Sequence, residues 1–210
     1  MKRTLLLAVA FGLPAFAVAQ APAKPDLARA RDIVNQVCSA CHGADGNSAI
    51  PANPSLAGMP ADYITTQLSH FKAGVRQNAI MQGFAATLSE ADMVSLGAYF
   101  ASQAPKPREA KDATLVRLGQ KLWRAGDAAT GVPACSACHG PTGAGVPKNY
   151  PRIAGQWSDY TVAQLKAFKA GERGMDKDGK DVMGRIMHGV AQNLTEAQMR
   201  AVAEYAQGLR

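Results

Sequence analysis

Two short motifs contain every cysteine of the chain. The hexapeptide Cys-Ser-Ala-Cys-His-Gly occurs at residues 38–43 and again at residues 135–140, 97 positions later. In a C-x-x-C-H sequence the two thiols lie about one helical turn apart, where they can add to the two vinyl groups of a haem, and the adjacent histidine can supply an axial nitrogen to the iron. The repeat therefore predicts two covalently bound haem c groups. Their attachment residues would be Cys38, Cys41, Cys135 and Cys138, with His42 and His139 as iron ligands.

Three other uses of the four cysteines explain the pattern less well. A structural zinc site would need thiolates from both motifs to converge, and it would leave both histidines without a role. A thioredoxin-like redox pair explains neither the histidine nor the doubling. Ordinary disulfides would suit an oxidising compartment but fail for the same reasons. We therefore favour haem attachment.

The sixth ligand decides what a histidine-ligated haem can do, because an open position permits catalysis and a second protein ligand favours electron transfer. Only two methionine pairs recur between the copies. Met93 and Met199 lie on the apolar face of a predicted helix, where methionine usually fills the core. Met81 and Met187 lie in predicted glycine-containing loops, from which a flexible thioether could reach the iron, so we predict them as axial ligands. Such ligation implies a comparatively high reduction potential.

Other side chains compete for the same role. Met183 lies only four residues before Met187, so it is an alternative ligand in the second copy. His70 and His188 could give a haem with two histidine ligands and a lower potential. Neither histidine recurs in the other copy, and we predict both as surface residues.

The two motifs belong to a tandem duplication. Identities recur at the offset of 97 through the middle of each copy and then at an offset of 106 to its end. The change reflects nine extra residues in the second copy between Gly174 and Met183. We expect the segment 172–181 to be a surface loop, because its Asp-x-Asp-Gly sequence is too short for a calcium loop.

Each copy is predicted to form three helices and no strand. A middle helix covers about residues 61–73 and stops before Gly74, and its twin stops at Gly171. The last helix begins at Ser89 in one copy and Thr195 in the other, both close to capping-box form. The first helix leads into the first cysteine, with an apolar stripe of Leu27, Ala30, Val34 and Val37 in one copy and Leu115, Leu118 and Leu122 in the other.

The domain boundary is placed where regular structure is disfavoured. Pro105 and Pro107 lie among charged residues between the copies, which suits a surface linker. We expect an N-terminal domain over residues 20–104, a linker over 105–111 and a C-terminal domain over 112–210.

The N-terminus predicts export. Residues 1–19 begin with Lys2 and Arg3, continue as an apolar stretch and end in Ala-Val-Ala, which is typical of a cleaved signal peptide. The net charge is +7 for the whole chain and about +5 after cleavage. This basic balance favours electrostatic steering toward an acidic partner. Nucleic acid is excluded, since Lys and Arg are scattered and the chain is exported.

The mature chain resembles the cytochrome c4 family of tandem dihaem cytochromes. The resemblance rests on the two haem motifs, the Asn-Pro-Ser-Leu-Ala-Gly segment at 53–58, the Tyr-Pro-Arg-Ile-Ala-Gly-Gln segment at 150–156 and the repeated Phe-Lys-Ala-Gly. It implies an all-α fold of two class I cytochrome c domains related by a pseudo-twofold axis, with the haem propionate edges facing each other.

The resemblance also implies roles for residues around the haems. The carbonyls of Pro54 and Pro151 would orient the two histidines. A further six residues are similar to the polar set around the propionates, with a solvated helix face as the alternative. They are Tyr63, Gln67, Arg76, Tyr160, Gln164 and Arg173.

The family implies a periplasmic carrier that is not an enzyme. It would take electrons from a quinol-oxidising complex or dehydrogenase and pass them to a terminal oxidase or reductase, so its partners are redox proteins. Peripheral membrane association and the oligomeric state stay open. The alternatives are the cytochrome subunit of a larger dehydrogenase and a dihaem peroxidase, which would need an open iron site.

Overall fold

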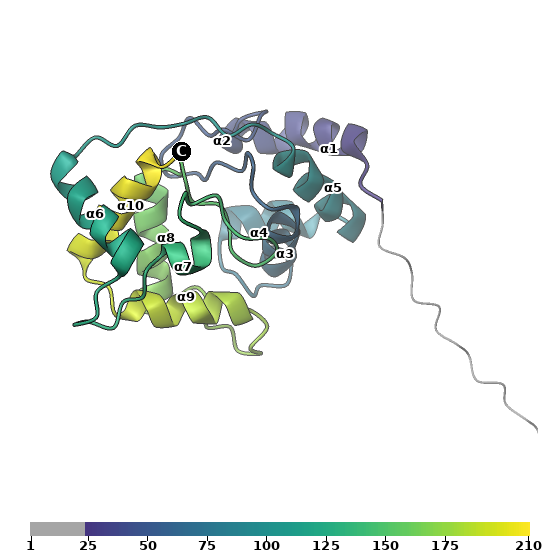
Figure 1. The fold of residues 1–210 in the computed structure, drawn as a ribbon. Helices are drawn as coiled ribbons and strands as arrows, with labels where there is room; N and C mark the ends of the chain where they lie inside the picture. The colour runs from purple at the N-terminus through teal and green to yellow at the C-terminus, as the bar shows by residue number, and fades with distance from the viewer. Residues whose placement is uncertain (1–23) are drawn as a thin grey trace, which may run out of the picture.

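A computed structural model describes residues 24–210, and its regular structure is helical (Figure 1). The predicted signal peptide lies outside these residues. The only β-pairing within the described part consists of two isolated bridges, which confirms the expected all-α class. The N-terminal half contains α1 (Leu27–Ile33), a π-helical turn η1 (Val34–Cys38), α2 (Ser39–His42), α3 (Ala61–Lys72), α4 (Ala79–Ala86) and α5 (Glu90–Ala101). The C-terminal half contains α6 (Ala113–Ala125), α7 (Ser136–His139), α8 (Ser158–Ala170), α9 (Val182–Gln192) and α10 (Glu196–Gly208).

The ends of the predicted helices follow the capping chemistry of the sequence. Ser89 at the start of α5 and Thr195 at the start of α10 each form a complete capping box with the residue three positions later. Gly74 and Gly171, which follow α3 and α8, have φ angles of 70° and 74°. A residue with a Cβ is strained there, so both helices end at glycine, as predicted.

Two helices were not expected from the sequence. Met81 and Met187 lie within α4 and α9, so their assignment to loops is wrong. Side chains cap both helices, since Asn78 accepts a hydrogen bond from the Met81 N–H and Asp181 accepts one from Gly184. Internal glycines lower helix propensity and obscured these helices, whereas the caps were readable signals.

Each half has its own hydrophobic core. One is built around Val34, Leu96 and Phe100, and the other around Trp123 and Met199. The first-helix stripes are partly wrong, because Leu27 and Leu118 are exposed, whereas Val37 lines the cavity described below.

The closest helix crossing in the C-terminal domain depends on Gly119. A Cβ at this position of α6 would lie 2.1 Å from the Ala201 carbonyl oxygen and 2.6 Å from Tyr205 Cβ on α10. We expect Gly119→Ala to lower the free energy of unfolding by about 1–3 kcal/mol, because the two helices must separate. Thermal and denaturant unfolding of the holoprotein would measure this.

Gly189→Ala is the matched control. Gly189 lies inside α9, and a Cβ there meets nothing within 4 Å. Alanine should raise helix stability by roughly 0.5–1 kcal/mol. Equal destabilisation by both substitutions would contradict the close crossing of α6 and α10.

The two halves lie side by side, and the segment between α5 and α6 passes across both of them (Figure 1). Among the helices of the described residues, none has the length and apolar character needed to cross a membrane.

Candidate haem sites

Both cysteine motifs line one continuous cavity between the two halves. The cavity has a volume of about 1110 Å³. This exceeds the roughly 300–1,000 Å³ of a site for one small ligand, as two adjoining sites would. The motif residues that line it are Cys38, Cys41, His42, Cys135, Cys138 and His139.

The two histidines are buried and oriented in the same way. His42 Nδ1 lies 2.8 Å from the Pro54 carbonyl oxygen, and His139 Nδ1 lies 3.0 Å from that of Pro151. A carbonyl can only accept, so Nδ1 carries the hydrogen and Nε2 keeps its lone pair for a metal. Burial lowers the pKa of both histidines, although the bond to the carbonyl opposes this. The neutral imidazole is therefore favoured, which is the form that can bind iron.

The cysteines do not support the alternatives to haem. All four are free. Burial raises the pKa of Cys38 and Cys135 to about 11, the opposite of what a redox-active thiol needs. Within residues 24–210, no group of three or more His, Cys, Asp or Glu side chains is arranged to hold a metal ion. The two motifs thus do not converge on a zinc site.

The candidate methionines all line the cavity. Met81 does so from α4, and Met183 and Met187 do so from successive turns of α9. Residues four apart share one face of a helix, so both methionines of α9 remain candidates and the choice of Met187 stays a prediction. Met93 and Met199 are buried in the cores at 2% and 1% exposure, as predicted.

Neither competing histidine is a free surface residue. The His70 side chain is only 14% exposed, and its Nδ1 lies 4.0 Å from an oxygen of Asp181. His188 Nδ1 contacts the Phe168 carbonyl oxygen. The segment 172–181 therefore does more than form a surface loop, because Asp181 at its end is buried, caps α9 and approaches the other half.

The six polar residues predicted near the propionates meet in one network across the interface. Each arginine bonds the glutamine of its own half and the tyrosine and glutamine of the other half. Arg76 bonds Gln67 at 2.7 Å, Tyr160 at 3.0 Å and Gln164 at 2.9 Å, and Arg173 bonds Gln164 at 2.7 Å, Tyr63 at 2.9 Å and Gln67 at 3.2 Å. The alternative of a solvated helix face is wrong, since both arginines are at most 9% exposed.

This network carries positive charge that its own members do not neutralise. Arg76 and Arg173 line the cavity, and none of the hydrogen-bond partners described for them is a carboxylate. Arg173 Nε is buried without a partner. Burial alone would raise the pKa of Tyr160. The charges and hydrogen bonds of Arg76 and Arg173 together lower this pKa by more than burial raises it, so the net shift is downward. Buried cations need anions nearby. The Asp181 carboxylate acts on Arg173 through its charge but forms none of the hydrogen bonds described for either arginine. The network therefore fits the carboxylate edge of a haem.

Two helical domains, each with a C-x-x-C-H motif and a buried histidine facing one cavity, define a two-domain c-type cytochrome. Comparisons with known proteins agree. The family model "Cytochrome c" matches residues 116–210, and the model "Cytochrome C oxidase, cbb3-type, subunit III" matches residues 25–100. The chain belongs to the cytochrome c4 family and carries two covalently bound haem c groups for electron transfer.

Three relatives illustrate the similarity. Cytochrome c4 of Thiocapsa roseopersicina is 41% identical over 83% of this chain and 88% of its own length. The thiosulfate dehydrogenase electron acceptor of Thiomonas intermedia is 41% identical over 80% of this chain and 76% of its own. The crystal structure of reduced recombinant cytochrome c4 from Pseudomonas stutzeri superposes with a TM-score of 0.80 at 37% identity, covering 89% of this chain and 100% of that one.

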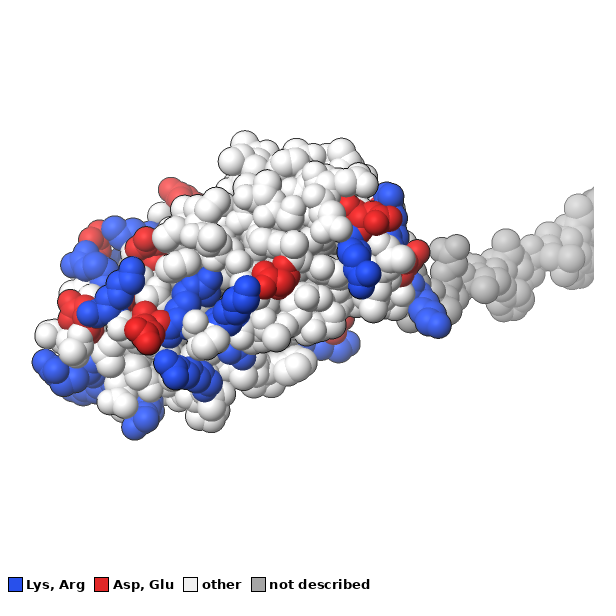
Figure 2. Space-filling model, turned by 90° about the horizontal axis from the view of Figure 1, so that it is seen from above, with Lys and Arg blue, Asp and Glu red and all other residues white. Residues whose placement is uncertain are grey.

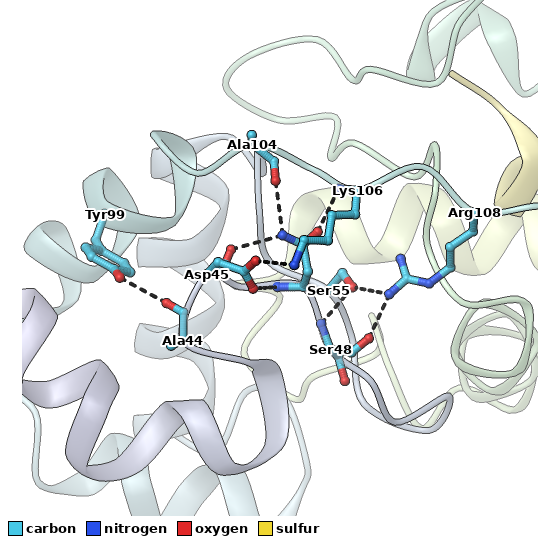
Figure 3. Close-up of polar contacts among 9 residues, drawn as sticks. Ala44, Asp45, Ser48, Ser55, Tyr99, Ala104, Lys106 and Arg108 are labelled. Carbon is cyan, nitrogen blue, oxygen red and sulfur yellow. Dashed lines mark hydrogen bonds and ion pairs between the residues drawn. The ribbon is translucent and has the colours of Figure 1, made fainter.

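The linker makes specific contacts that the sequence did not indicate (Figure 3). Lys106 forms an ion pair with Asp45 at 2.7 Å, which with bonds from Asn47 holds the pKa of that carboxyl at about 2. Arg108 donates to the Ser48 carbonyl oxygen at 2.7 Å and to Ser55 Oγ at 3.0 Å. The first part of the linker is thus attached to the N-terminal domain, whereas Glu109 and Lys111 bond Gln207 and Glu204 of the C-terminal domain. Its charged residues were the available signal, but their partners are distant in sequence.

Proposed function

We propose that this chain is a periplasmic electron carrier that accepts electrons from a quinol-oxidising complex or dehydrogenase and delivers them to a terminal oxidase or reductase. The observation that carries the proposal is the single cavity lined by both haem motifs. When bound, each haem supplies one-electron chemistry at its iron. The residues that line the cavity would hold two such groups within one chain.

The proposed ligands follow from the positions around this cavity. Cys38 and Cys41 would attach one haem and Cys135 and Cys138 the other. The axial ligands would be His42 with Met81 and His139 with Met187. The crossed arginine network would bind the propionates. We also propose residues 105–111 as the linker between the two domains, because each half has its own hydrophobic core.

Charge divides unequally between the domains and suggests where partners dock. Residues 24–104 contain five Lys and Arg against six Asp and Glu, whereas residues 105–210 contain sixteen against ten. Figure 2 shows Lys and Arg gathered toward the left-hand end, which is the C-terminal half. An acidic redox partner would be steered to this domain.

A charge reversal on α6 would test this steering. Lys121 is exposed on α6 in the basic domain. Lys121→Glu should slow electron exchange with an acidic redox protein by on the order of tenfold at low ionic strength. The difference in rate from the unsubstituted protein should shrink as salt is added. Stopped-flow absorbance of the haems measures the second-order rate constant.

Arg31→Glu is the control, because Arg31 is also exposed but lies in the N-terminal domain. A larger effect at Arg31 than at Lys121 would refute docking on the C-terminal domain.

A second candidate partner comes from one relative. The similarity to a thiosulfate dehydrogenase electron acceptor favours a role as the electron-accepting partner of a dehydrogenase. Co-purification with a catalytic subunit would support it.

The decisive experiment uses the reduced holoprotein. Mixed with membranes that contain a terminal oxidase, it should be reoxidised and give up two electrons per chain. Mixed with hydrogen peroxide, it should be reoxidised only slowly, without sustained turnover. Fast peroxide turnover with no transfer to the oxidase would instead identify a peroxidase.

A further inference from the structure

One side chain of the C-terminal domain holds the backbone next to Pro54 in the N-terminal domain. Gln156 Oε1 accepts a hydrogen bond from the Ser55 N–H at 2.9 Å, and Gln156 Nε2 donates to the Ser55 carbonyl oxygen at 3.0 Å. Oε1 also accepts from the Trp157 N–H at 3.1 Å, which fixes the orientation of the amide. Gln156 is 5% exposed, so these bonds do not compete with water.

The linker binds the side chain of the same residue, Ser55. Arg108 donates to Ser55 Oγ, which in turn accepts from the Ser48 N–H at 3.1 Å (Figure 3). The Arg108 guanidinium also lies 4.1 Å from the ring centre of Trp157 and donates to the Gly155 carbonyl oxygen. Ser55 is therefore fixed through its N–H and its carbonyl by Gln156 and through its hydroxyl by Arg108 and Ser48.

The C-terminal domain supports the N-terminal domain in this way, but the N-terminal domain has no equivalent contact to offer in return. In the repeat, Met59 occupies the position of Gln156, and Arg152 occupies the position of Ser55. A thioether has no N–H to donate and is a weak acceptor, so Met59 cannot make the reciprocal pair of bonds to the Arg152 backbone. Met59 is instead buried in the N-terminal core.

We propose that Gln156 is a positioning residue for His42, the iron ligand of the opposite domain. Pro54 accepts the His42 Nδ1–H, and the peptide that follows Pro54 is the one that Gln156 binds. Groups that fix the partner of a ligating histidine set its orientation and its basicity. The inference rests on the proposed function, in which His42 binds the iron. This one contact between the domains, from Gln156 to Ser55, would thus tune the N-terminal haem and not the C-terminal haem.

Gln156→Met tests the proposal, because it copies the residue that the other repeat already uses. We expect amide exchange of Ser55 to become at least tenfold faster in the reduced holoprotein, as its N–H loses its acceptor. One haem should shift in reduction potential and in its low-spin EPR signal, and the other should not. Comparison with Met81 and Met187 variants identifies the shifted haem, which should be the N-terminal one.

Gln207→Met is the matched control. Gln207 is also buried and also bonds two backbone groups, Ser158 N–H and the Glu109 carbonyl, but neither lies next to a histidine-orienting proline. It should lower stability without moving either EPR signal. Arg108→Met serves as the second variant if Gln156→Met folds poorly, and it should shift the same haem.

The outcomes separate this inference from the function on which it rests. If Gln156→Met and Arg108→Met leave both haem signals unchanged, or shift both equally, the positioning role is refuted. If His42→Ala leaves the N-terminal haem spectrum unchanged, the ligand assignment itself is wrong, and the positioning role falls with it.

Discussion

The double variant Cys38→Ala/Cys41→Ala is expected to bind one covalently attached haem instead of two. The two thiols lie on adjacent helical segments that lead to His42, and the C-terminal domain has a separate core that does not depend on them. The haem content, measured as absorbance per chain under denaturing conditions, should fall by half. Mass spectrometry should find the remaining haem on the second motif.

The reciprocal variant Cys135→Ala/Cys138→Ala is the control, and its remaining haem should lie on the first motif. A chain that loses both haems in either variant would show that the two domains cannot be loaded independently. A chain that keeps both would exclude the cysteines as attachment residues.

The second large effect concerns the axial methionines. Met81→Ala and Met187→Ala should each abolish the near-infrared sulfur-to-iron absorption of one haem and lower its reduction potential. Axial ligands set haem potentials over a range of about 0.8 V, so we expect a decrease on the order of 0.1 V at the affected site. Spectroelectrochemical titration reports both quantities together.

Met183→Ala is the matched control, since Met183 faces the same cavity one turn earlier on α9. It should leave the sulfur-to-iron band intact. If Met183→Ala removes the band and Met187→Ala does not, the extra residues have shifted the ligand by one helical turn.

The sequence was sufficient for features that depend on local spacing. The thiol and histidine positions follow from haem chemistry, and the capping boxes at Ser89 and Thr195 follow from short side-chain contacts. Comparison of the two copies then selected Met81 and Met187 as the predicted ligands, because a shared role leaves the same residue at the same repeat position. The polar network was expected from the family resemblance.

Features that depend on contacts between the domains could not be predicted. Nothing in the local sequence indicates that Gln156 reaches Ser55, or that Asp181 lies close to His70. These residues differ between the copies, so the repeat gave no signal for them. The helices around Met81 and Met187 were missed for another reason, since internal glycines lower helix propensity while tertiary packing supplies the missing stability.

The short linker has a thermodynamic consequence for the interface. It joins α5 to α6 and is held to the N-terminal domain by Lys106 and to the C-terminal domain at Glu109 and Lys111. A short tether gives the joined domains an effective concentration in the millimolar range. Docking is then intramolecular, so the hydrogen bonds between the two halves do not have to join two separate chains. A single polar substitution at the interface can therefore change how tightly the two domains associate without separating them.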